Sequence, residues 1–218
     1  MKPYYEHAGI TIYHGDCREI LPTLGKFDLL LTDPPYGIGL SRGINHQRAS
    51  KQHEGIQNDE DTSCRDQMLE LMGDQKGVLF GSFYAPFPAN TKQVLVWQKP
   101  ADSGLVGSVT GFRRDAEPIF LTGLWPVQTV RWSSVMGGLR GMSSITTETG
   151  HPHTKPVELL ESLIIKANPA TILDPFMGSG TTLVAAKNLG RKAVGIELEE
   201  QYCEIAVRRL SQEVMAFG

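Results

Sequence analysis

The C-terminal third of the chain alternates between helical and extended patterns, and this alternation restricts the possible folds more than any other feature. The expected elements are, in order, a helix over residues 156–167, a strand over 171–173, a helix over 180–189, a strand over 192–196 and a helix over 199–214. Strands that alternate with helices form parallel sheets whose two faces are both covered by helices. The sequence therefore predicts a doubly wound α/β fold.

The rest of the chain fits the same fold, because it carries short apolar runs typical of buried strands. Five strands are expected here, at 27–32, 78–81, 94–97, 117–121 and 127–132, together with a helix over 62–71. The 218 residues, 40% of them hydrophobic, are enough for one core and too few for two domains of ordinary size. Residues 133–150 show almost no core-forming pattern. We therefore expect one domain over residues 1–218 with a small polar insertion.

Composition excludes several classes of protein. The net charge is −3, which does not favour a polyanion partner, although a local basic surface could still bind one. The three cysteines are far apart and fit neither a disulfide framework nor a zinc site. His151 and His153 could be half of a metal site, but no further ligands follow at a useful spacing, so we expect no metal. Because no apolar run approaches the roughly 18 residues that cross a bilayer, and the first ten residues lack a signal-like apolar segment, we expect a cytoplasmic protein without a membrane partner.

A glycine-rich segment, residues 174–182, lies where a predicted strand passes into a helix. Gly178 and Gly180 would let a ligand approach the backbone, and the helix that follows presents free N–H groups. Glu197 follows Gly180 by seventeen residues, at the end of the next predicted strand, where a carboxylate can accept hydrogen bonds from two ribose hydroxyls. Because neither GxxxxGK[ST] nor GxGxxG is present, the segment favours a nucleoside without a pyrophosphate. The alternative is an ordinary glycine-rich connection.

A second motif, Asp33-Pro34-Pro35-Tyr36, ends another buried strand. The two prolines stiffen the turn, so a carboxylate, a backbone carbonyl and an aromatic ring are held in a fixed relation. These groups suit an amine on a planar base: Asp33 and the Pro34 carbonyl accept its two N–H bonds, and Tyr36 stacks on the ring. Accepting both hydrogens aims the nitrogen lone pair at an electrophile. The alternative is a stiffened turn in which Asp33 is a cap and Tyr36 a surface aromatic.

Together, DPPY and DPFMGSGTT resemble the amino-methylating DNA methyltransferases, which use S-adenosylmethionine to methylate adenine N6 or cytosine N4. The resemblance extends from His14 to about Leu210, and the catalytic motif precedes the cofactor motif, as in the family's β arrangement. Segments 14–17, 96–99, 113–118 and 151–156 also look like those of the family. The resemblance implies a Rossmann-like, mostly parallel seven-stranded sheet with permuted motif order and one antiparallel strand near the C-terminal end of the core.

The resemblance also implies roles for individual residues. The catalytic residues are expected to be Asp33, Pro34, Pro35 and Tyr36. Asp16 is expected to bind the adenine amine of the cofactor, and Thr154 and Lys155 to lie beside its methionine end. Cys17 could suggest a nucleophile, but no matching segment of the base-carbon methyltransferases accompanies it, so it is expected in the pocket wall. The full set expected at the cofactor is Asp16, Cys17, Asp33, Thr154, Lys155, Asp174, Phe176, Gly178, Gly180, Thr181, Thr182, Glu197 and Leu198.

Two segments carry local positive charge and are the candidates for binding double-stranded DNA. Residues 37–53 hold three basic and no acidic residues, and residues 92–155 hold seven basic and four acidic residues. Such a surface would contact phosphates, although each charge could also be an ordinary solvated one. The candidate contacts are Arg42, Arg48, Lys51, Lys99, Arg113, Arg114, Arg131 and Arg140. Residues 133–150, together with the loop 37–61, are the expected target-recognition elements, and Trp132 is expected in the core.

The function implied is transfer of a methyl group to the N6 amine of an adenine flipped out of double-stranded DNA. Asp33 favours adenine, because DPPY is commoner in adenine enzymes and SPPY in cytosine enzymes. The alternatives are a cytosine-N4 enzyme, an RNA or protein-glutamine methyltransferase, and an inactive DNA-binding module. A short insertion can cover few base pairs, so a homodimer is plausible. The family type implies a bacterial or phage enzyme, either part of a restriction-modification system or solitary.

Overall fold

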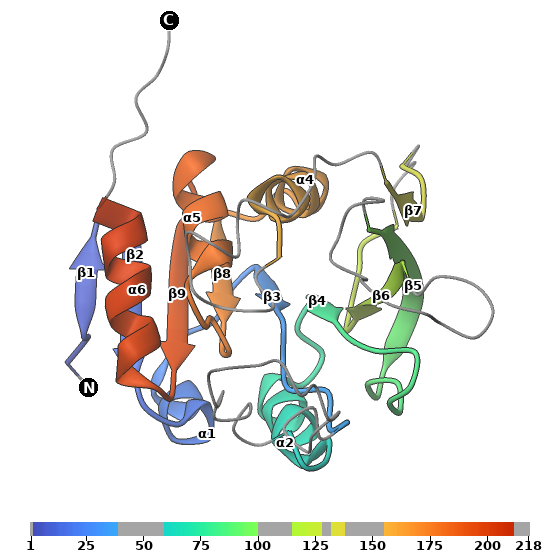
Figure 1. Cartoon of the computed structure of the whole chain (residues 1–218), viewed down its shortest axis with the longest axis horizontal. Coiled ribbons are helices and arrows are strands. Elements are labelled where there is room, and N and C mark those ends of the chain that lie inside the picture. The colour runs from blue at the N-terminus through green and yellow to red at the C-terminus, as the bar shows by residue number, and fades with distance from the viewer. Residues whose placement is uncertain (1, 39–58, 100–114, 128–131, 138–154, 212–218) are drawn as a thin grey trace, which may run out of the picture.

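The fold is built on one sheet, which the chain crosses in both directions. The computed structural model describes residues 2–38, 59–99, 115–127, 132–137 and 155–211. Within these residues the chain forms nine strands, shown in Figure 1. In their order across the sheet they are β1 (Tyr5–His7), β2 (Ile10–His14), β9 (Lys192–Glu197), β8 (Thr171–Asp174), β3 (Leu29–Thr32), β4 (Gly77–Phe80), β6 (Ala116–Thr122), β5 (Thr91–Gln98) and β7 (Val135–Met136).

Most neighbouring strands are parallel, which confirms the predicted fold class. The run β2-β9-β8-β3-β4 is parallel throughout, β7 is parallel to β5, and β6 is antiparallel to both β4 and β5. β1 and β7 extend the two edges of the sheet beyond the seven expected strands, and β1 is antiparallel to β2. Among the other seven, β6 is the antiparallel strand. It lies in the middle of the chain rather than near the C-terminal end, because it pairs with β5 as an antiparallel neighbour and needs no helical crossover.

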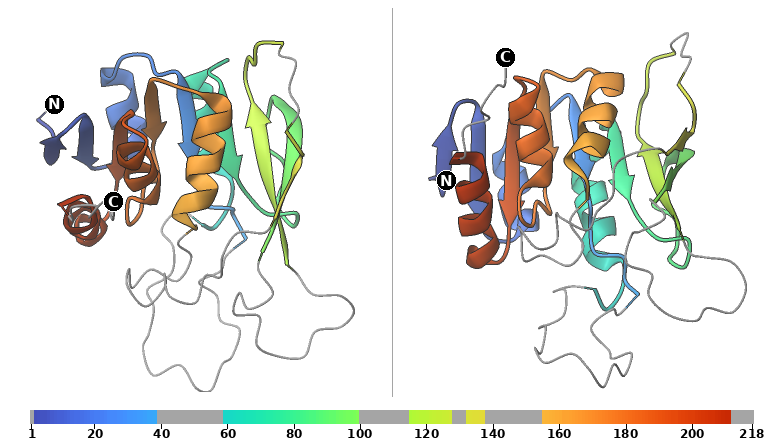
Figure 2. Two further views of the ribbon diagram at one scale, coloured as in Figure 1. Left: turned by 90° about the horizontal axis from the view of Figure 1, so that it is seen from above. Right: turned by 45° about the horizontal axis from the view of Figure 1, so that its top comes forward.

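Helices cover both faces of the sheet (Figure 2). Helices α4, α5 and α6 pack on one face, and α1 and α2 on the other. Their bounds, with those of a short 3-10 helix, are α1 (Cys17–Ile20), η1 (Leu21–Thr23), α2 (Ser63–Met72), α4 (Val157–Ala167), α5 (Thr181–Asn188) and α6 (Glu200–Ser211). In β3, Leu29 and Leu31 face the first layer and Leu30 faces the second. This double burial explains why β3 is an uninterrupted apolar run.

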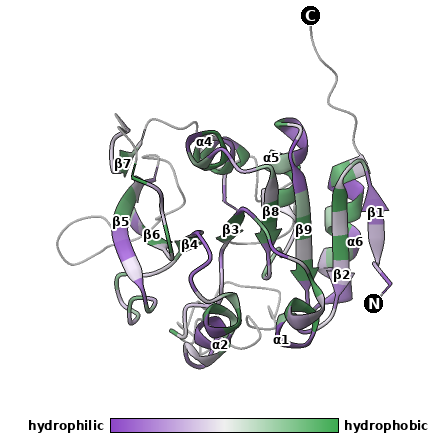
Figure 3. Cartoon of the chain, turned by 180° about the vertical axis from the view of Figure 1, so that it is seen from behind, coloured by the Kyte–Doolittle hydropathy of each residue, from purple (hydrophilic) through white to green (hydrophobic). Residues whose placement is uncertain are grey.

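The hydropathy of the elements follows this arrangement. Figure 3 shows hydrophobic strands in the middle of the sheet and the hydrophilic β1 at its edge. Helix α4 buries Leu159, Leu160, Leu163 and Ile164, the stripe that its spacing predicted. It ends at Asn168, whose φ of 48° is left-handed, a common way for a helix to stop. No helix in the described ranges is both long and apolar enough to cross a membrane.

Some predicted elements differ from the structure. Residues 128–131 of the strand expected over 127–132 lie outside the described residues, and Val127 and Trp132 are not in a strand. Trp132 is not in the core: 60% of its surface is exposed, and its ring lies 5.5 Å from the Lys166 ammonium. The sequence indicated only that the ring is large and apolar, and at this position, just before the edge strand β7, the ring remains on the surface.

Candidate active site

The predicted site residues meet at one edge of the sheet. Asp33 follows β3, Asp174 ends β8, Glu197 ends β9, and Asp16 comes two residues after β2. These four strands are neighbours and run in the same direction, so their carboxyl ends lie side by side. Ligands of open α/β sheets bind at this edge. The structure therefore brings the DPPY motif and the glycine-rich segment together, on the adjacent strands β3 and β8.

The Asp33 carboxylate is held by two side chains. Its Oδ1 accepts a hydrogen bond of 2.6 Å from the Tyr36 hydroxyl, and its Oδ2 accepts one of 2.7 Å from the Lys155 ammonium. Lys155 also donates to the Tyr36 oxygen at 3.1 Å, which closes a triangle of polar contacts. Burial and the nearby Asp33 charge raise the pKa of Tyr36 well above its ordinary value, so the phenol stays protonated. Asp33 itself is 31% exposed and can be reached from solvent.

Two more charges continue this cluster, and the sequence did not single out the first as a site residue. Glu117, at the start of β6, lies with its Oε2 3.5 Å from the Lys155 Nζ, and its Oε1 pairs with the Lys99 ammonium. Lys155 is 9% exposed. Burial alone would lower the pKa of Lys155, but Asp33, Tyr36 and Glu117 together raise it well above its ordinary value. Lys155 is therefore a cation inside the site.

The turn that carries Asp33 is rigid. Pro34 is buried, and the Gly37 amide donates 2.8 Å to the Asp59 carboxylate. Gly37 has a φ of 69°, and a side chain there would collide with the backbone of Asp61, just before α2. Only glycine fits this conformation at such a close approach. The position of Asp33 at the edge of the sheet is thus fixed by the turn and by α2.

The glycine-rich segment is organised by two buried carboxylates. Asp174 accepts hydrogen bonds from the Thr32 hydroxyl at 2.6 Å and the Phe176 amide at 3.2 Å. Burial raises the pKa of Asp174 to about 6, although these hydrogen bonds lower it. Glu197 accepts from the amides of Gly178 and Glu199, both at 2.9 Å. Burial also raises the pKa of Glu197.

The start of α5 completes this segment. Gly180 has a φ of 79°, and a Cβ there would lie 2.8 Å from the Ala206 Cβ on α6, so the glycine allows the two helices to pack. Thr181 and Thr182 are buried, and the Thr181 hydroxyl accepts from Arg209 at 3.1 Å. Farther along the edge, the Leu198 carbonyl lies 3.1 Å from the His14 Nε2.

Asp16 caps α1, accepting 2.8 Å from the Arg18 amide. Its carboxylate also forms an ion pair with the Arg18 guanidinium, and these hydrogen bonds lower the pKa of Asp16. Cys17 is buried beside Cys64 of α2, so it lies in the interior at the edge where it was expected. Asp16 is 23% exposed, which leaves part of the carboxylate open to a ligand.

Several predicted residues cannot be placed in this geometry. Thr154 and most of the DNA-contact candidates lie outside the described residues, as do most of the segment 133–150 and of the loop 37–61: the contact candidates concerned are Arg42, Arg48, Lys51, Arg113, Arg114, Arg131 and Arg140. Lys99 is described, and it is paired with Glu117. Within the described ranges no group of three or more His, Cys, Asp and Glu side chains could hold a metal ion. His151 and His153 are outside these ranges.

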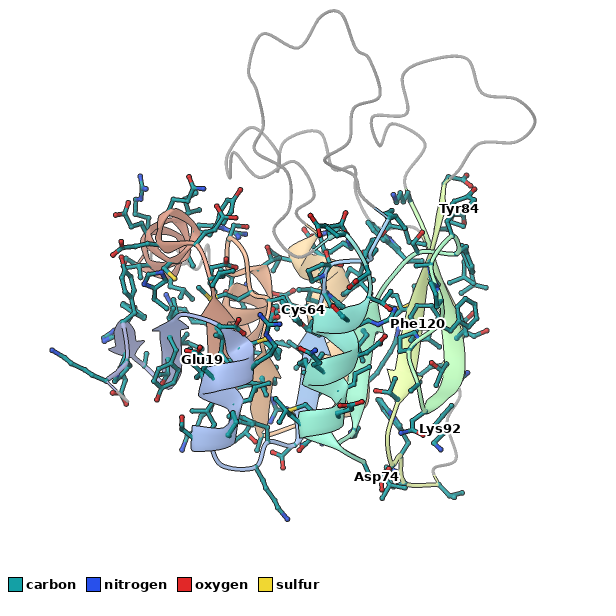
Figure 4. The ribbon with its side chains drawn as sticks, turned by 90° about the horizontal axis from the view of Figure 1, so that it is seen from below. Glu19, Cys64, Asp74, Tyr84, Lys92 and Phe120 are labelled. Carbon is teal, nitrogen blue, oxygen red and sulfur yellow. The ribbon has the colours of Figure 1, made fainter. Side chains whose placement is uncertain are left out.

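A group of exposed aromatic residues near the site was also missed. Phe83, Tyr84 and Phe87 lie in the loop between β4 and β5 and are 46%, 70% and 50% exposed. Figure 4 shows Tyr84 at one end of the sheet and Asp74 and Lys92 at the other. Since Tyr84 follows the carboxyl end of β4, the aromatic loop lies at the edge that carries Asp33. The sequence signal was three aromatic residues within five positions.

Comparison with known proteins agrees with this arrangement. The chain matches the family model of the N6 and N4 methyltransferases, described as DNA methylase, over residues 96–208. It is 28% identical to the type II methyltransferase M.ScaI of Streptomyces caespitosus, covering 99% of this chain and 86% of that protein. It is also 28% identical to the DNA adenine methyltransferase YhdJ of Escherichia coli K12, covering 92% and 82%.

Two solved structures share the fold. The complex of M1.HpyAVI with SAM superposes with a TM-score of 0.64 at 24% identity, over 93% of this chain and all of that one. The cytosine-N4-specific PvuII DNA methyltransferase also superposes with a TM-score of 0.64, at 15% identity, over 99% and 91%. The family match, which covers more than half of the chain, shows that this protein belongs to the N6/N4 DNA methylase family.

Proposed function

We propose that the protein transfers a methyl group from S-adenosylmethionine to the N6 amine of an adenine flipped out of double-stranded DNA. The observation that carries this proposal is the placement of two sites on neighbouring strands. An acceptor site built around Asp33 follows β3, and a nucleoside site built around Glu197 and the glycine turn follows β9 and β8. Two substrates bound there would lie beside each other, and positioning of this kind supplies a large part of catalysis.

The residues at the carboxyl ends of β8 and β9 fit the cofactor. The Gly178 and Glu199 amides each use one lone pair on a Glu197 oxygen, so each oxygen keeps acceptor capacity for a ribose hydroxyl. Asp16 would accept from the adenine amine, with Phe176, Leu198 and the helix start at Gly180 to Thr182 around the nucleoside. When bound, S-adenosylmethionine supplies a methyl group made electrophilic by the sulfonium.

Asp33 orients the nucleophile. Its carboxylate, with the Pro34 carbonyl, would accept the two N–H bonds of the target amine and aim the nitrogen lone pair, while the Tyr36 ring stacks on the base. The negative charge of Asp33 then stabilises the positive charge that develops on nitrogen as the bond to carbon forms. Because Lys155 contacts Asp33 and Tyr36, we assign it to the target-amine side instead of the methionine end. Thr154 keeps its expected place beside the cofactor.

DNA is the expected substrate because the target base must leave the stack to reach Asp33. YhdJ is named a DNA adenine methyltransferase, and the Asp at position 33 favours adenine here. The second candidate is cytosine N4, since the PvuII enzyme of that specificity has the same fold. We further propose that residues 1–218 form one catalytic domain, that 133–150 and the loop 37–61 read the target sequence, and that the enzyme binds DNA as a homodimer.

A methylation assay with labelled S-adenosylmethionine and mixed genomic DNA, followed by nucleoside analysis, tests the proposal. A 6-methyladenine peak is expected; a 4-methylcytosine peak would keep the mechanism and change the base, and no methylated nucleoside would count against both. The Asp33→Ala variant should lose transfer while its affinity for S-adenosylmethionine stays close to that of the wild type. Asp74→Ala, at the opposite end of the sheet (Figure 4), is the matched control and should remain active. Normal turnover by Asp33→Ala would refute the role of Asp33.

A further inference from the structure

Four charged side chains of alternating sign form a row that ends at Asp33. Lys99 pairs with Glu117 Oε1, Lys155 lies 3.5 Å from Glu117 Oε2, and the same ammonium lies 2.7 Å from Asp33 Oδ2. The row holds two cations and two anions, so its formal charge is zero. Lys155 is the member that contacts both carboxylates.

The proposed function requires a change in this row. Asp33 has to accept the target amine, but its Oδ1 already accepts from Tyr36 and its Oδ2 from Lys155. A cation 2.7 Å from Oδ2 also neutralises the carboxylate and would repel the positive charge that develops on the amine. The ammonium must therefore leave Oδ2 for the carboxylate to act.

The structure offers the ammonium another acceptor. Glu117 Oε2 is buried and, within the described part of the chain, accepts no hydrogen bond, although the Lys155 Nζ is only 3.5 Å away. A buried acceptor without a hydrogen bond is costly, so a contact with this oxygen would be favourable. A move from Asp33 to Glu117 also keeps the buried cation paired at both ends of its path.

We propose that Lys155 is a positioning residue that changes partner during the reaction: its ammonium moves from Asp33 Oδ2 to Glu117 Oε2 when the target amine enters. This inference rests on the proposed function, because it concerns the same site. Glu117 holds the displaced ammonium, and Lys99 fixes the Glu117 carboxylate through its other oxygen. Tyr36 stays on Oδ1, so one oxygen of Asp33 remains oriented while the other becomes free.

The Glu117→Gln variant tests the exchange, because it keeps the shape of the side chain and removes the charge that receives Lys155. With the ammonium retained on Asp33, kcat is expected to fall about tenfold or more, while KM for DNA and the affinity for S-adenosylmethionine stay within about twofold of the wild type. Glu117→Asp keeps the charge and should retain more activity than Glu117→Gln. An unchanged kcat in Glu117→Gln, or an equal loss in both variants, would overturn the exchange.

A double variant separates this mechanism from a merely structural role. If Glu117→Gln is slow because Lys155 cannot leave Asp33, then adding Lys155→Met should raise kcat above that of Glu117→Gln alone, which is non-additive behaviour. A double variant that is as slow as Glu117→Gln, or slower, would refute the exchange. The matched controls are Glu204→Gln, in an exposed pair with Arg208, and Lys92→Met, at the far end of the sheet (Figure 4). Both controls should keep the wild-type kcat.

The outcome for the wild type distinguishes the two levels of the argument. Absence of methyl transfer by the wild-type protein counts against the proposed function. Normal transfer by the wild type together with normal transfer by Glu117→Gln counts against the exchange alone. Thermal melting and S-adenosylmethionine binding of each variant show that a lost kcat is not caused by unfolding.

Discussion

Asp174→Asn should stabilise the protein, and the size of the effect should depend on pH. Asp174 is buried, and its pKa is raised from 3.8 to about 6, mainly by burial. A group whose pKa is higher in the folded chain contributes stability that is complete below the unfolded pKa and is lost as the pH rises through the folded pKa. At 1.36 kcal/mol for each tenfold change in proton affinity, the loss is about 3 kcal/mol at pH 8 and about half of that at pH 5.

Asparagine cannot ionise, so the variant does not suffer this loss. Its carbonyl can still accept from the Thr32 hydroxyl and the Phe176 amide, while its new N–H groups need acceptors and reduce the gain. That reduction is the same at both pH values, so the difference between them is the cleaner quantity. The stability advantage of Asp174→Asn over the wild type should grow by about 1.4 kcal/mol between pH 5 and pH 8. For a domain of this size, this corresponds to about 3 to 6 °C in Tm.

Thermal unfolding of both proteins at pH 5 and pH 8 measures this growth. The control is Asp61→Asn, because hydrogen bonds from Ser63 lower the pKa of Asp61 and its carboxyl is therefore already ionised at pH 5. Its effect on stability should be the same at both pH values. If the difference in Tm between Asp174→Asn and the wild type does not change with pH, the Asp174 carboxyl carries no desolvation cost and the reasoning fails.

Three further predictions follow from the same structure. Glu197→Gln should weaken S-adenosylmethionine binding about tenfold or more, because hydrogen bonds to a charged acceptor are among the stronger ones; titration calorimetry measures this, and an unchanged affinity would remove Glu197 from the cofactor site. Gly180→Ala should destabilise the fold by about 1 to 3 kcal/mol in urea unfolding, since its φ of 79° and a Cβ 2.8 Å from Ala206 leave no room for a side chain; a neutral result would show that the helices can separate. Trp132→Ala should change the free energy of unfolding by less than about 1 kcal/mol, because the ring is 60% exposed; a loss of several kcal/mol would place the ring in a core after all.

The sequence predicted the parts of the fold that local patterns determine. The run from Leu29 to Leu31 is apolar at every position because both faces of β3 are covered, and Asp33 follows where two prolines end the strand. β2 was missed because Ile10 and Ile12 alternate with partly exposed residues over only five positions. That alternation is typical of a strand and could have been recognised.

The charge cluster was beyond reach of the sequence for a different reason. Lys155 and Asp33 are 122 residues apart in the chain, and they meet only because β3 and the start of α4 come to the same edge. The position of Glu117 depends on β6 running antiparallel between β4 and β5, which no local pattern specifies. The ring of Trp132 was misplaced because hydrophobicity alone does not tell whether a neighbouring element covers it.

The pairing of β2 with β9 has a consequence for how the protein is made. Ile10 pairs with Ala193, so a strand among the first to leave the ribosome finds its neighbour only when the chain is nearly complete. At an elongation rate of about 5 to 20 residues per second, roughly 10 to 40 s separate the synthesis of the two strands. Asp16 and Glu197 lie just beyond the ends of this pair, so the nucleoside-binding half of the site is assembled last. During translation the β3 turn with its catalytic carboxylate exists well before the part that would hold the methyl donor.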